Sequence, residues 1–446
     1  MGELDLEQRL AGPALVCRQW YRLCLSRELR QDLTLTVSVA DGQASVLPRL
    51  RSLLSWLVKH SAAPRDVTLR LWHGDAQRTA GPVHSSESAA EVVALLNSCA
   101  TACPTAERLT IVHSGHYIPN GWVVAQRGLR EARLRSRTRL HLLTTWEALT
   151  QLRSLELVAP CIVLAPGAAL PPSLTALTLG GDRGPHMPHQ VGELSNLRCL
   201  RLRGVAYGAG GFEVLRRLSA LEHLHLDRCC LPACLPALTG LRSLHLRACI
   251  AGQGCEAELA AGVAAALRRL SQLTALALVQ LPLAACCPPA MAALRQLQCL
   301  TVLPSGSRTG SGAGGRNAAA PLNGVLPPPW PAGLRFLTAP FALVSGSLAW
   351  LSAARQLGRL CLTDCPSVSG IPPSTWLTFF SWAEVHTPLG SLEFAAPPPQ
   401  HAALLNKACD RLTAKRPGLH LTVRPYGGAP ELAPLDSWPV PACNKP

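Results

Sequence analysis

Residues 194–226 read LSNLRCLRLRGVAYGAGGFEVLRRLSALEHLHL, and this stretch decides the fold. It holds two copies of the pattern Leu-x-x-Leu-x-x-Leu-x-Leu, which begin at Leu194 and Leu218, 24 residues apart. Further copies begin at Leu149, Leu238, Leu270 and Leu294, and weaker ones centre on Leu177, Leu337, Leu360 and Leu392. A period of about 20 to 29 residues is typical of repeat proteins in which every unit contributes one strand.

The closing Leu-x-Leu of each copy predicts a strand, because successive side chains of a strand point to opposite faces and the two leucines then share one face. One such strand cannot bury its apolar side alone, but stacked copies form a parallel sheet with a continuous core. The sequence therefore predicts an α/β solenoid with a parallel sheet on its concave side. Helices are expected over residues 50–60, 88–100, 261–270 and 401–414, and additional strands over 67–71, 109–111 and 419–423.

The composition agrees with a core of small repeated units. Hydrophobic residues make up 48% of the 446 residues, whereas aromatic residues make up 4% and charged residues 15%. This balance excludes an intrinsically disordered chain, which would be poor in apolar residues. Length alone suggests about three domains, but the repeat replaces that expectation with one elongated solenoid. The formal net charge is +15, which raises the question of an acidic partner.

The pattern resembles the leucine-rich repeat, and a short segment ahead of it resembles a second family. Residues 14–23 read ALVCRQWYRL, which is similar to the second half of an F-box, a helical module often joined to leucine-rich repeats. The family's first helix, which opens with Leu-Pro, has no counterpart before Leu4. The resemblance implies that Leu15, Val16, Trp20 and Leu23 contact the small F-box-binding adaptor of a cullin complex. The alternative is an amphipathic helix that covers the open apolar end of the first repeat.

The segments between the repeats set the expected organisation. Residues 304–333 are rich in Gly, Ser and Pro, which is typical of a flexible insertion or linker. We expect an F-box-like segment over residues 1–40, leucine-rich repeats over 41–303, the insertion over 304–333, further repeats with a cap over 334–424, and an irregular tail over 425–446.

Basic and imidazole side chains are predicted to gather on the concave face. The residues between the strand leucines that point to this face include Arg133, Arg135, Arg201, Arg203, His223, His225, His245 and Arg247. Because neighbouring strands lie about 4.8 Å apart, Arg201, His225 and His245 would form a ladder about 10 Å long. Arginine suits carboxylate and phosphate groups, so one hypothesis is a patch for an acidic or phosphorylated protein partner. The alternative is a solvated charged face.

The cysteines have a structural explanation. The sequence has 18 of them, including Cys-x3-Cys pairs that begin at Cys99, Cys230 and Cys361, but it lacks the matching ligand pairs of a zinc site. We therefore expect neither a metal nor a cofactor, and we expect buried, reduced cysteines that behave as small hydrophobes. Three of them follow a Leu-x-Leu strand in the pattern Leu-x-Leu-x-x-Cys, where the chain turns: Cys229, Cys249 and Cys365.

Other functional classes find little support in the sequence. Only four of the 42 basic residues are lysine, and no nucleic-acid motif is present. Catalytic motifs such as Gly-x-Ser-x-Gly or a phosphate loop are missing from the sequence. The first residues do not form a secretory signal, and no apolar run reaches the length of a membrane span. The expected chain is neither secreted nor membrane-bound, and it lies in the cytoplasm or nucleus as a monomer outside its complexes.

Taken with the resemblance, these observations predict a protein that binds other proteins and is not an enzyme. The F-box-like segment implies substrate recognition in a cullin-RING ubiquitin ligase, with the substrate on the concave face. The alternative is a stand-alone leucine-rich-repeat scaffold in signalling or in a cytoskeletal or axonemal assembly.

Overall fold

A computed structural model describes most of the predicted repeats. The described residues are 34–39, 51–52, 54–55, 57–59, 65–71, 91, 94–95, 98–113, 126–136, 139–142, 146–165, 167–181, 187–204, 212–250, 255–286, 289–305, 330–345, 348–363, 373–386, 388–395 and 399–424. The F-box-like segment, most of the 304–333 insertion and the 425–446 tail lie outside them. The chain divides into two compact units, Met1–Cys234 and Leu235–Pro446, called unit 1 and unit 2 below.

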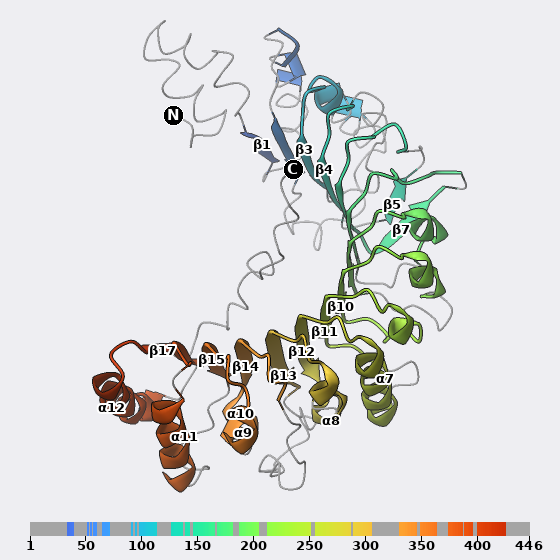
Figure 1. The fold of residues 1–446 in the computed structure, drawn as a ribbon. Helices are drawn as coiled ribbons and strands as arrows, with labels where there is room; N and C mark the ends of the chain where they lie inside the picture. Colours follow the sequence, from blue (N-terminus) through green and yellow to red (C-terminus); the bar gives the residue numbers. More distant parts are fainter. Residues whose placement is uncertain are drawn as a thin grey trace, which may run out of the picture. The chain divides into compact units, whose positions relative to one another are not determined.

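Unit 1 is built on one parallel sheet (Figure 1). Its strands follow the order of the sequence, with β5 and β7 set apart in a small sheet of their own. The main strands are β1 (Thr34–Val39), β2 (Asp66–Leu71), β3 (Arg108–His113), β4 (Glu131–Ser136), β6 (Ser154–Val158), β8 (Ala176–Gly180), β9 (Cys199–Arg203) and β10 (His223–Asp227). The small sheet pairs β5 (Arg139–Leu142) with β7 (Cys161–Leu164).

The register explains why leucine recurs at these positions. Leu200 of β9 pairs with Leu224 of β10, and Leu202 pairs with Leu226. All four side chains are at most 2% exposed, so equivalent leucines stack into a continuous apolar column. The predicted leucine core is therefore confirmed.

The length of each repeat decides what connects its strands. Short connections in unit 1 hold the 3-10 helices η3 (His189–Glu193) and η4 (Glu213–Arg217). In unit 2 the 32 residues from Leu244 to Leu276 leave room for the 14-residue helix α7 (Glu256–Arg269). This helix buries Leu259, Val263 and Leu267, which recur at helical spacing, and it confirms the helix expected over 261–270.

Unit 2 has a second run of parallel strands with helices on one side (Figure 1). Its strands are β11 (Ser243–Arg247), β12 (Ala275–Leu281), β13 (Cys299–Pro304), β14 (Phe336–Pro340), β15 (Arg359–Thr363), β16 (Ser391–Ala395) and β17 (His420–Arg424). Its short helices are η5 (Leu235–Ala237), α8 (Leu283–Cys286), η6 (Pro289–Ala293), α9 (Phe341–Ser345) and α10 (Leu348–Leu351), and its long ones are α11 (Pro373–Val385) and α12 (Pro399–Lys415).

The last repeats hold a cluster of aromatic residues in their core. Phe341 stacks on Trp376 with ring centroids 3.9 Å apart, and Phe379 meets Phe341 edge to face at 5.4 Å. These rings pack helix α11 on α9. The apolar residues of α11 lie around most of its circumference. The helix expected over 401–414 and the strand expected over 419–423 are confirmed as α12 and β17.

The cysteines that follow the strands serve the turns, as predicted. Cys229 is buried, and its thiol donates to the carbonyl oxygens of Leu202 at 3.4 Å and of Asp227 at 3.3 Å. Cys249 is buried in the same position after β11, and its thiol donates to the Arg247 oxygen at 3.6 Å. Cys365 lies outside the described residues. Every cysteine that the structure describes is a free thiol.

Candidate functional site

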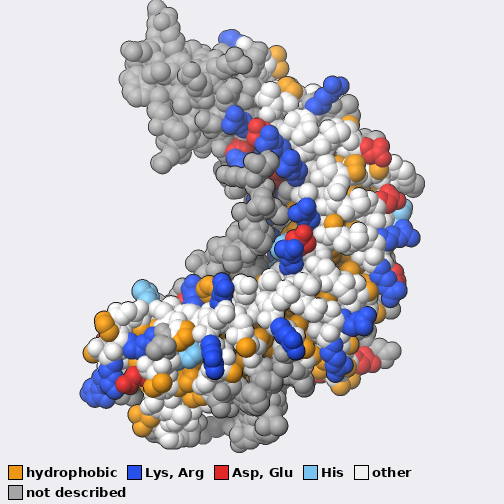
Figure 2. Space-filling view, viewed as in Figure 1, with side chains coloured by type: hydrophobic (Ala, Val, Ile, Leu, Met, Phe, Trp, Pro, Cys, Tyr) orange, Lys and Arg blue, Asp and Glu red, His pale blue; other side chains and the backbone are white. Residues whose placement is uncertain are grey.

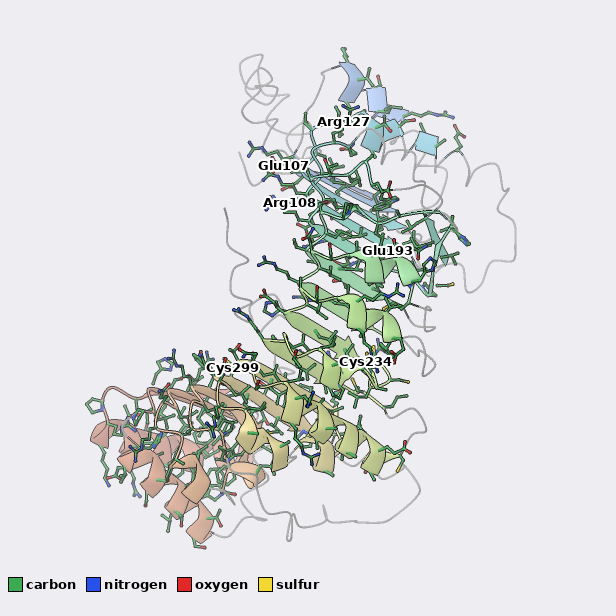
Figure 3. The ribbon with its side chains drawn as sticks, turned by 45° about the vertical axis from the view of Figure 1, so that its right-hand side comes forward. Glu107, Arg108, Arg127, Glu193, Cys234 and Cys299 are labelled. Atoms are coloured by element: carbon green, nitrogen blue, oxygen red, sulfur yellow. The ribbon has the colours of Figure 1, made fainter. Side chains whose placement is uncertain are left out.

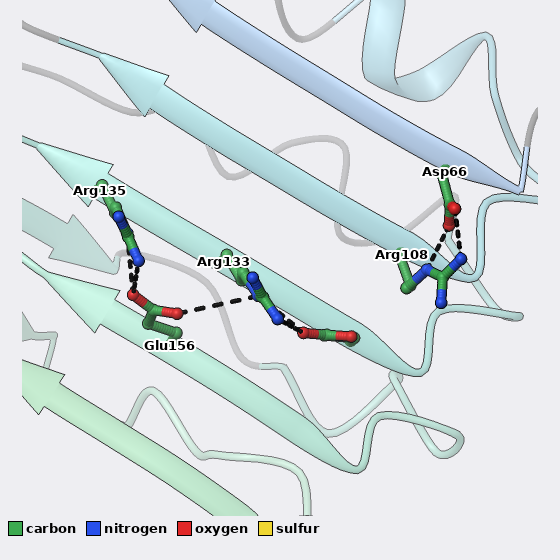
Figure 4. A network of polar contacts seen from close by, with 6 residues as sticks. Asp66, Arg108, Arg133, Arg135 and Glu156 are labelled. Atoms are coloured by element: carbon green, nitrogen blue, oxygen red, sulfur yellow. Dashed lines mark hydrogen bonds and ion pairs between the residues drawn. The ribbon is translucent and has the colours of Figure 1, made fainter. Parts of the chain in front are cut away.

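The open face of unit 1 is the face of its sheet opposite the buried leucines. On strands β2 to β6 it carries a network of ion pairs (Figure 4). Arg108 forms a two-bond pair with Asp66 on the neighbouring strand. Arg133 lies 2.6 Å from Glu131 and 3.8 Å from Glu156. The same Glu156 accepts a 2.7 Å contact from Arg135, so the predicted residues Arg133 and Arg135 share one carboxylate.

In these pairs the side chain of the acid is less exposed than that of the arginine. The Glu156 side chain is 19% exposed, whereas that of Arg135 is 53% exposed. Asp227 on β10 is 9% exposed, whereas its partner Arg203 on β9 is 63% exposed at a distance of 3.2 Å. A partner approaching the open face therefore meets guanidinium groups first, and the carboxylates beneath hold them in place.

Strands β9 and β10 bring together the other residues predicted for unit 1. His225 pairs in register with Arg201, and His223 pairs with Cys199. Arg201 and His225 are therefore direct neighbours on adjacent strands. His223 is only 9% exposed and its ring nitrogen lies 4.0 Å from Glu222, so less of it is open to a partner than the sequence suggested.

A strand of small side chains separates the two charged groups of unit 1. Strand β8 presents Ala176, Thr178 and Gly180 on the open face, where Thr178 pairs in register with Glu156 on one side and Arg201 on the other. The open face thus has an uncharged strip between Glu156 of β6 and Arg201 of β9.

The remaining predicted residues belong to unit 2. His245 and Arg247 lie on β11, where they pair in register with Ala277 and Val279 of β12. His245 is buried and Arg247 is half-buried. Of the three residues of the predicted ladder, Arg201 and His225 thus belong to unit 1 and His245 belongs to unit 2.

Unit 1 also has a second row of polar residues, six of the seven charged, that was not predicted from the sequence. These residues directly precede the strands, and hydrogen bonds between their backbones join them in one row, here called the edge row: Arg65, Glu107, Arg130, Arg153, Thr175, Arg198 and Glu222. Figure 3 shows Glu107 and Arg108 toward this edge, whereas Glu193 and Cys234 lie on the side of the 3-10 helices. The recurring tetrad Leu-Arg-x-Leu or Leu-Arg-x-Ala, as at Leu129, Leu152 and Leu197, is the signal that could have revealed the row.

Few ionisable groups of the described residues have a shifted pKa. The pKa of Arg108 is raised, first by its hydrogen bonds to Asp66. Burial raises the pKa of the Cys299 thiol on the open face of unit 2, which opposes formation of a reactive thiolate. Within the described ranges no three His, Cys, Asp or Glu side chains gather in a way that could hold a metal ion, and every helix there is too short or too polar to span a membrane.

Comparison with known proteins finds likeness in structure only. No protein-family model matches the chain, and no curated protein matches it. Internalin C2 from Listeria monocytogenes is 18% identical with a TM-score of 0.32, over 46% of this chain and 82% of that one. A chain of the mouse RP105/MD-1 complex is 15% identical with a TM-score of 0.44, over 77% of this chain and 57% of that one.

A third likeness is to a plant protein. The leucine-rich-repeat ectodomain of the membrane receptor kinase GASSHO1/SCHENGEN3 from Arabidopsis thaliana is 13% identical with a TM-score of 0.32, over 90% of this chain and 48% of that one. The Leu-x-Leu strands of this chain keep their parallel register through each unit. This chain has the leucine-rich-repeat fold.

Proposed function

We propose that this chain is a non-enzymatic protein-binding subunit whose partner docks on the open face of unit 1. The observation that carries the proposal is the layered arrangement of the ion pairs, with arginine above and carboxylate below. A guanidinium group has five N–H donors, and a carboxylate beneath it engages only some of them. Those that remain can bind carbonyl and carboxylate oxygens of a protein partner.

The ion pairs also prepare the face for binding. An unrestrained arginine loses about 0.5–1.5 kcal/mol of conformational freedom when a partner immobilises it. Glu156 holds Arg135 at 2.7 Å and Asp227 holds Arg203 at 3.2 Å, so part of that loss has already occurred in the free protein. The uncharged strip of β8 then gives an extended segment room to lie between Glu156 of β6 and Arg201 of β9.

We further propose that the bound protein is a substrate of a cullin-RING ubiquitin ligase. The support is the F-box-like sequence of residues 14–23, with Leu15, Val16, Trp20 and Leu23 as the adaptor contacts, ahead of the repeats. In this proposal the N-terminal segment recruits the ligase, and the open face selects the protein to be modified.

Exchanging the two members of an ion pair tests the open face. The double variant R135E/E156R exchanges the members of the Arg135–Glu156 pair, removes the 3.8 Å contact of Glu156 with Arg133, and places a carboxylate where the arginine was outermost. We expect the tagged full-length variant to lose the proteins that co-purify with the wild type. The matched control, E384K/K415E, exchanges a 2.8 Å pair between α11 and α12 and should keep them. Equal partner sets for both variants would contradict the proposed binding face.

A separate experiment tests the ligase role. The wild-type chain should co-purify with the F-box-binding adaptor and a cullin, and the variant W20A/L23A should lose both while keeping its open-face partners. If the wild type keeps its partners and never captures the adaptor, the chain acts instead as a stand-alone scaffold.

A further inference from the structure

The edge row of unit 1 brings arginines onto neighbouring strands. The backbone nitrogen of Arg153 donates to the Arg130 oxygen at 2.9 Å, which fixes these two residues side by side at the starts of β6 and β4. Both side chains are exposed. The next member of the row is Thr175, which is uncharged, so Arg198 lies one strand further away.

The carboxylates of the edge row and of the open face of β4 and β6 are engaged by other arginines. In the edge row, Glu107 lies 4.0 Å from Arg65 and Glu222 lies 3.9 Å from Arg198. On the open face, Glu131 and Glu156 pair with Arg133 and Arg135.

The positive charge of the edge row is therefore concentrated at one place. Within the described ranges neither the Arg130 nor the Arg153 guanidinium has an acidic group within 4.0 Å. Two like charges on adjacent strands disfavour each other. An anion that binds both groups at once would remove this repulsion.

The geometry points to phosphate as that anion. Neighbouring strands lie about 4.8 Å apart, which lets two guanidinium forks reach the oxygens of a single phosphate group. A phosphorylated side chain carries a charge of about −1.5 to −2 at neutral pH and three strong acceptor oxygens. It therefore matches both arginines, whereas one carboxylate neutralises only one of them.

We propose that Arg130 and Arg153 bind the phosphate of a phosphorylated serine or threonine in an extended protein segment. This inference rests on the proposal that unit 1 binds a protein partner, and it names the chemistry of that partner at the edge of the sheet. The phosphate binds at the edge row, and the residues that flank it extend onto the open face beside Arg133.

The test uses a fluorescein-labelled peptide library with phosphoserine fixed at its centre and degenerate flanking residues. Two parallel libraries carry serine or glutamate at the central position. Binding to the full-length chain is measured by fluorescence anisotropy at physiological salt, where long-range attraction between exposed charges is largely screened. We expect the wild type to bind the phosphoserine library at least about tenfold more tightly than either parallel library, since each charge-assisted hydrogen bond strengthens binding by about tenfold.

The decisive variant is R130Q/R153Q, which should weaken binding of the phosphoserine library by at least about tenfold. The matched control is R268Q/R269Q, which removes two exposed arginines from the last turn of α7 and should leave binding unchanged. Because all four side chains are exposed, the variants should melt at the wild-type temperature.

Three results would overturn the inference: equal binding of the phosphoserine and glutamate libraries, unchanged binding by R130Q/R153Q, or equal weakening by the control variant. None of them would overturn the proposed function, which stands if R135E/E156R still loses the co-purifying proteins. If R135E/E156R keeps those proteins while R130Q/R153Q loses the phosphopeptides, the partner is held at the edge row and the open-face proposal fails.

Discussion

Replacing Arg416 tests how the C-terminal helices of unit 2 are held together. Arg416 follows helix α12, and its guanidinium donates to the backbone oxygens of Ala383 at 2.7 Å, His386 at 2.8 Å and Leu389 at 2.7 Å. The first oxygen belongs to the last turn of α11, where carbonyl groups have no partner within the helix. One side chain thus closes the end of α11 and joins it to α12.

The magnitude follows from these contacts. A hydrogen bond to a charged group contributes about 1.5–3 kcal/mol, and holding an arginine side chain in one conformation costs about 2 kcal/mol. The three bonds share one guanidinium and do not add fully. We therefore expect R416A to destabilise the packing of α11 against α12 by about 2–4 kcal/mol.

Hydrogen exchange read by mass spectrometry is the suitable assay, because it reports local opening in a chain whose global unfolding is not expected to be two-state. Amides of α11 and α12 should exchange about thirtyfold faster or more in R416A. Amides of α11 and α12 should exchange almost as fast in R416K as in R416A, because an ammonium group cannot reach three separate oxygens in a planar arrangement.

The control is R411A, which removes an exposed arginine of α12 and should change exchange by less than about threefold. Exchange in R416A that matches the wild type would refute the reasoning. Wild-type exchange in R416K would show that positive charge near the helix end, rather than the three hydrogen bonds, holds the helices.

Three further perturbations have expected outcomes. Gly181→Ala should lower the free energy of unfolding in urea titrations by about 1–3 kcal/mol, because its Cβ would lie 2.1 Å from a backbone oxygen of the preceding repeat. Gly128→Ala has open space around its Cβ and should change the free energy of unfolding by less than about 0.5 kcal/mol. Burial, and then the nearby positive charge of an arginine, lower the pKa of His386. The unfolded chain therefore takes up the proton first, and stability falls as the pH drops below the ordinary value of 6.5. H386Q should lose less stability than the wild type between pH 7.5 and pH 5, and equal losses would contradict this. Burial raises the pKa of the Cys99 thiol to about 12, so iodoacetamide at pH 8 should modify the exposed Cys255 long before Cys99, as peptide mass spectrometry would show.

Most strands of the main sheet were predictable because leucine or another apolar residue is repeated at the same two positions. Leu200 and Leu202 identify β9 without reference to any other segment, and their burial follows from alternation alone. Helix α11 was missed for the opposite reason. Its apolar residues, among them Trp376 and Phe379, surround the helix instead of following one stripe, so no helical period marks it. Its rings pack against Phe341, and that contact between separate repeats cannot be read from the helix sequence alone.

Alternation along a strand predicts which side chains share the open face, but it does not predict which charges pair across strands. Alternation correctly placed Arg133 and Arg135 on the open face, yet their partner Glu156 comes from the next repeat, 21 residues after Arg135. Strand sequences read one at a time show which side chains share a face, whereas the pairing of charges depends on the register between strands. The sequence reading also confined itself to the strand positions, so it passed over Arg130 and Arg153, which precede them.

The register therefore separates two kinds of arginine that the sequence cannot distinguish. On the open face several arginines have a carboxylate partner on the same or a neighbouring strand, as Arg108 has in Asp66, so these arginines offer hydrogen-bond donors while their charge is partly compensated. At Arg130 and Arg153 two basic residues fall opposite each other without an acid between them. Electrostatic attraction to an anion is thus concentrated at the edge, while the open face offers directional donors. A segment that carries a phosphate at one position and neutral residues beside it would satisfy both surfaces, whereas a uniformly acidic segment would compete with carboxylates that already occupy the arginines of the face.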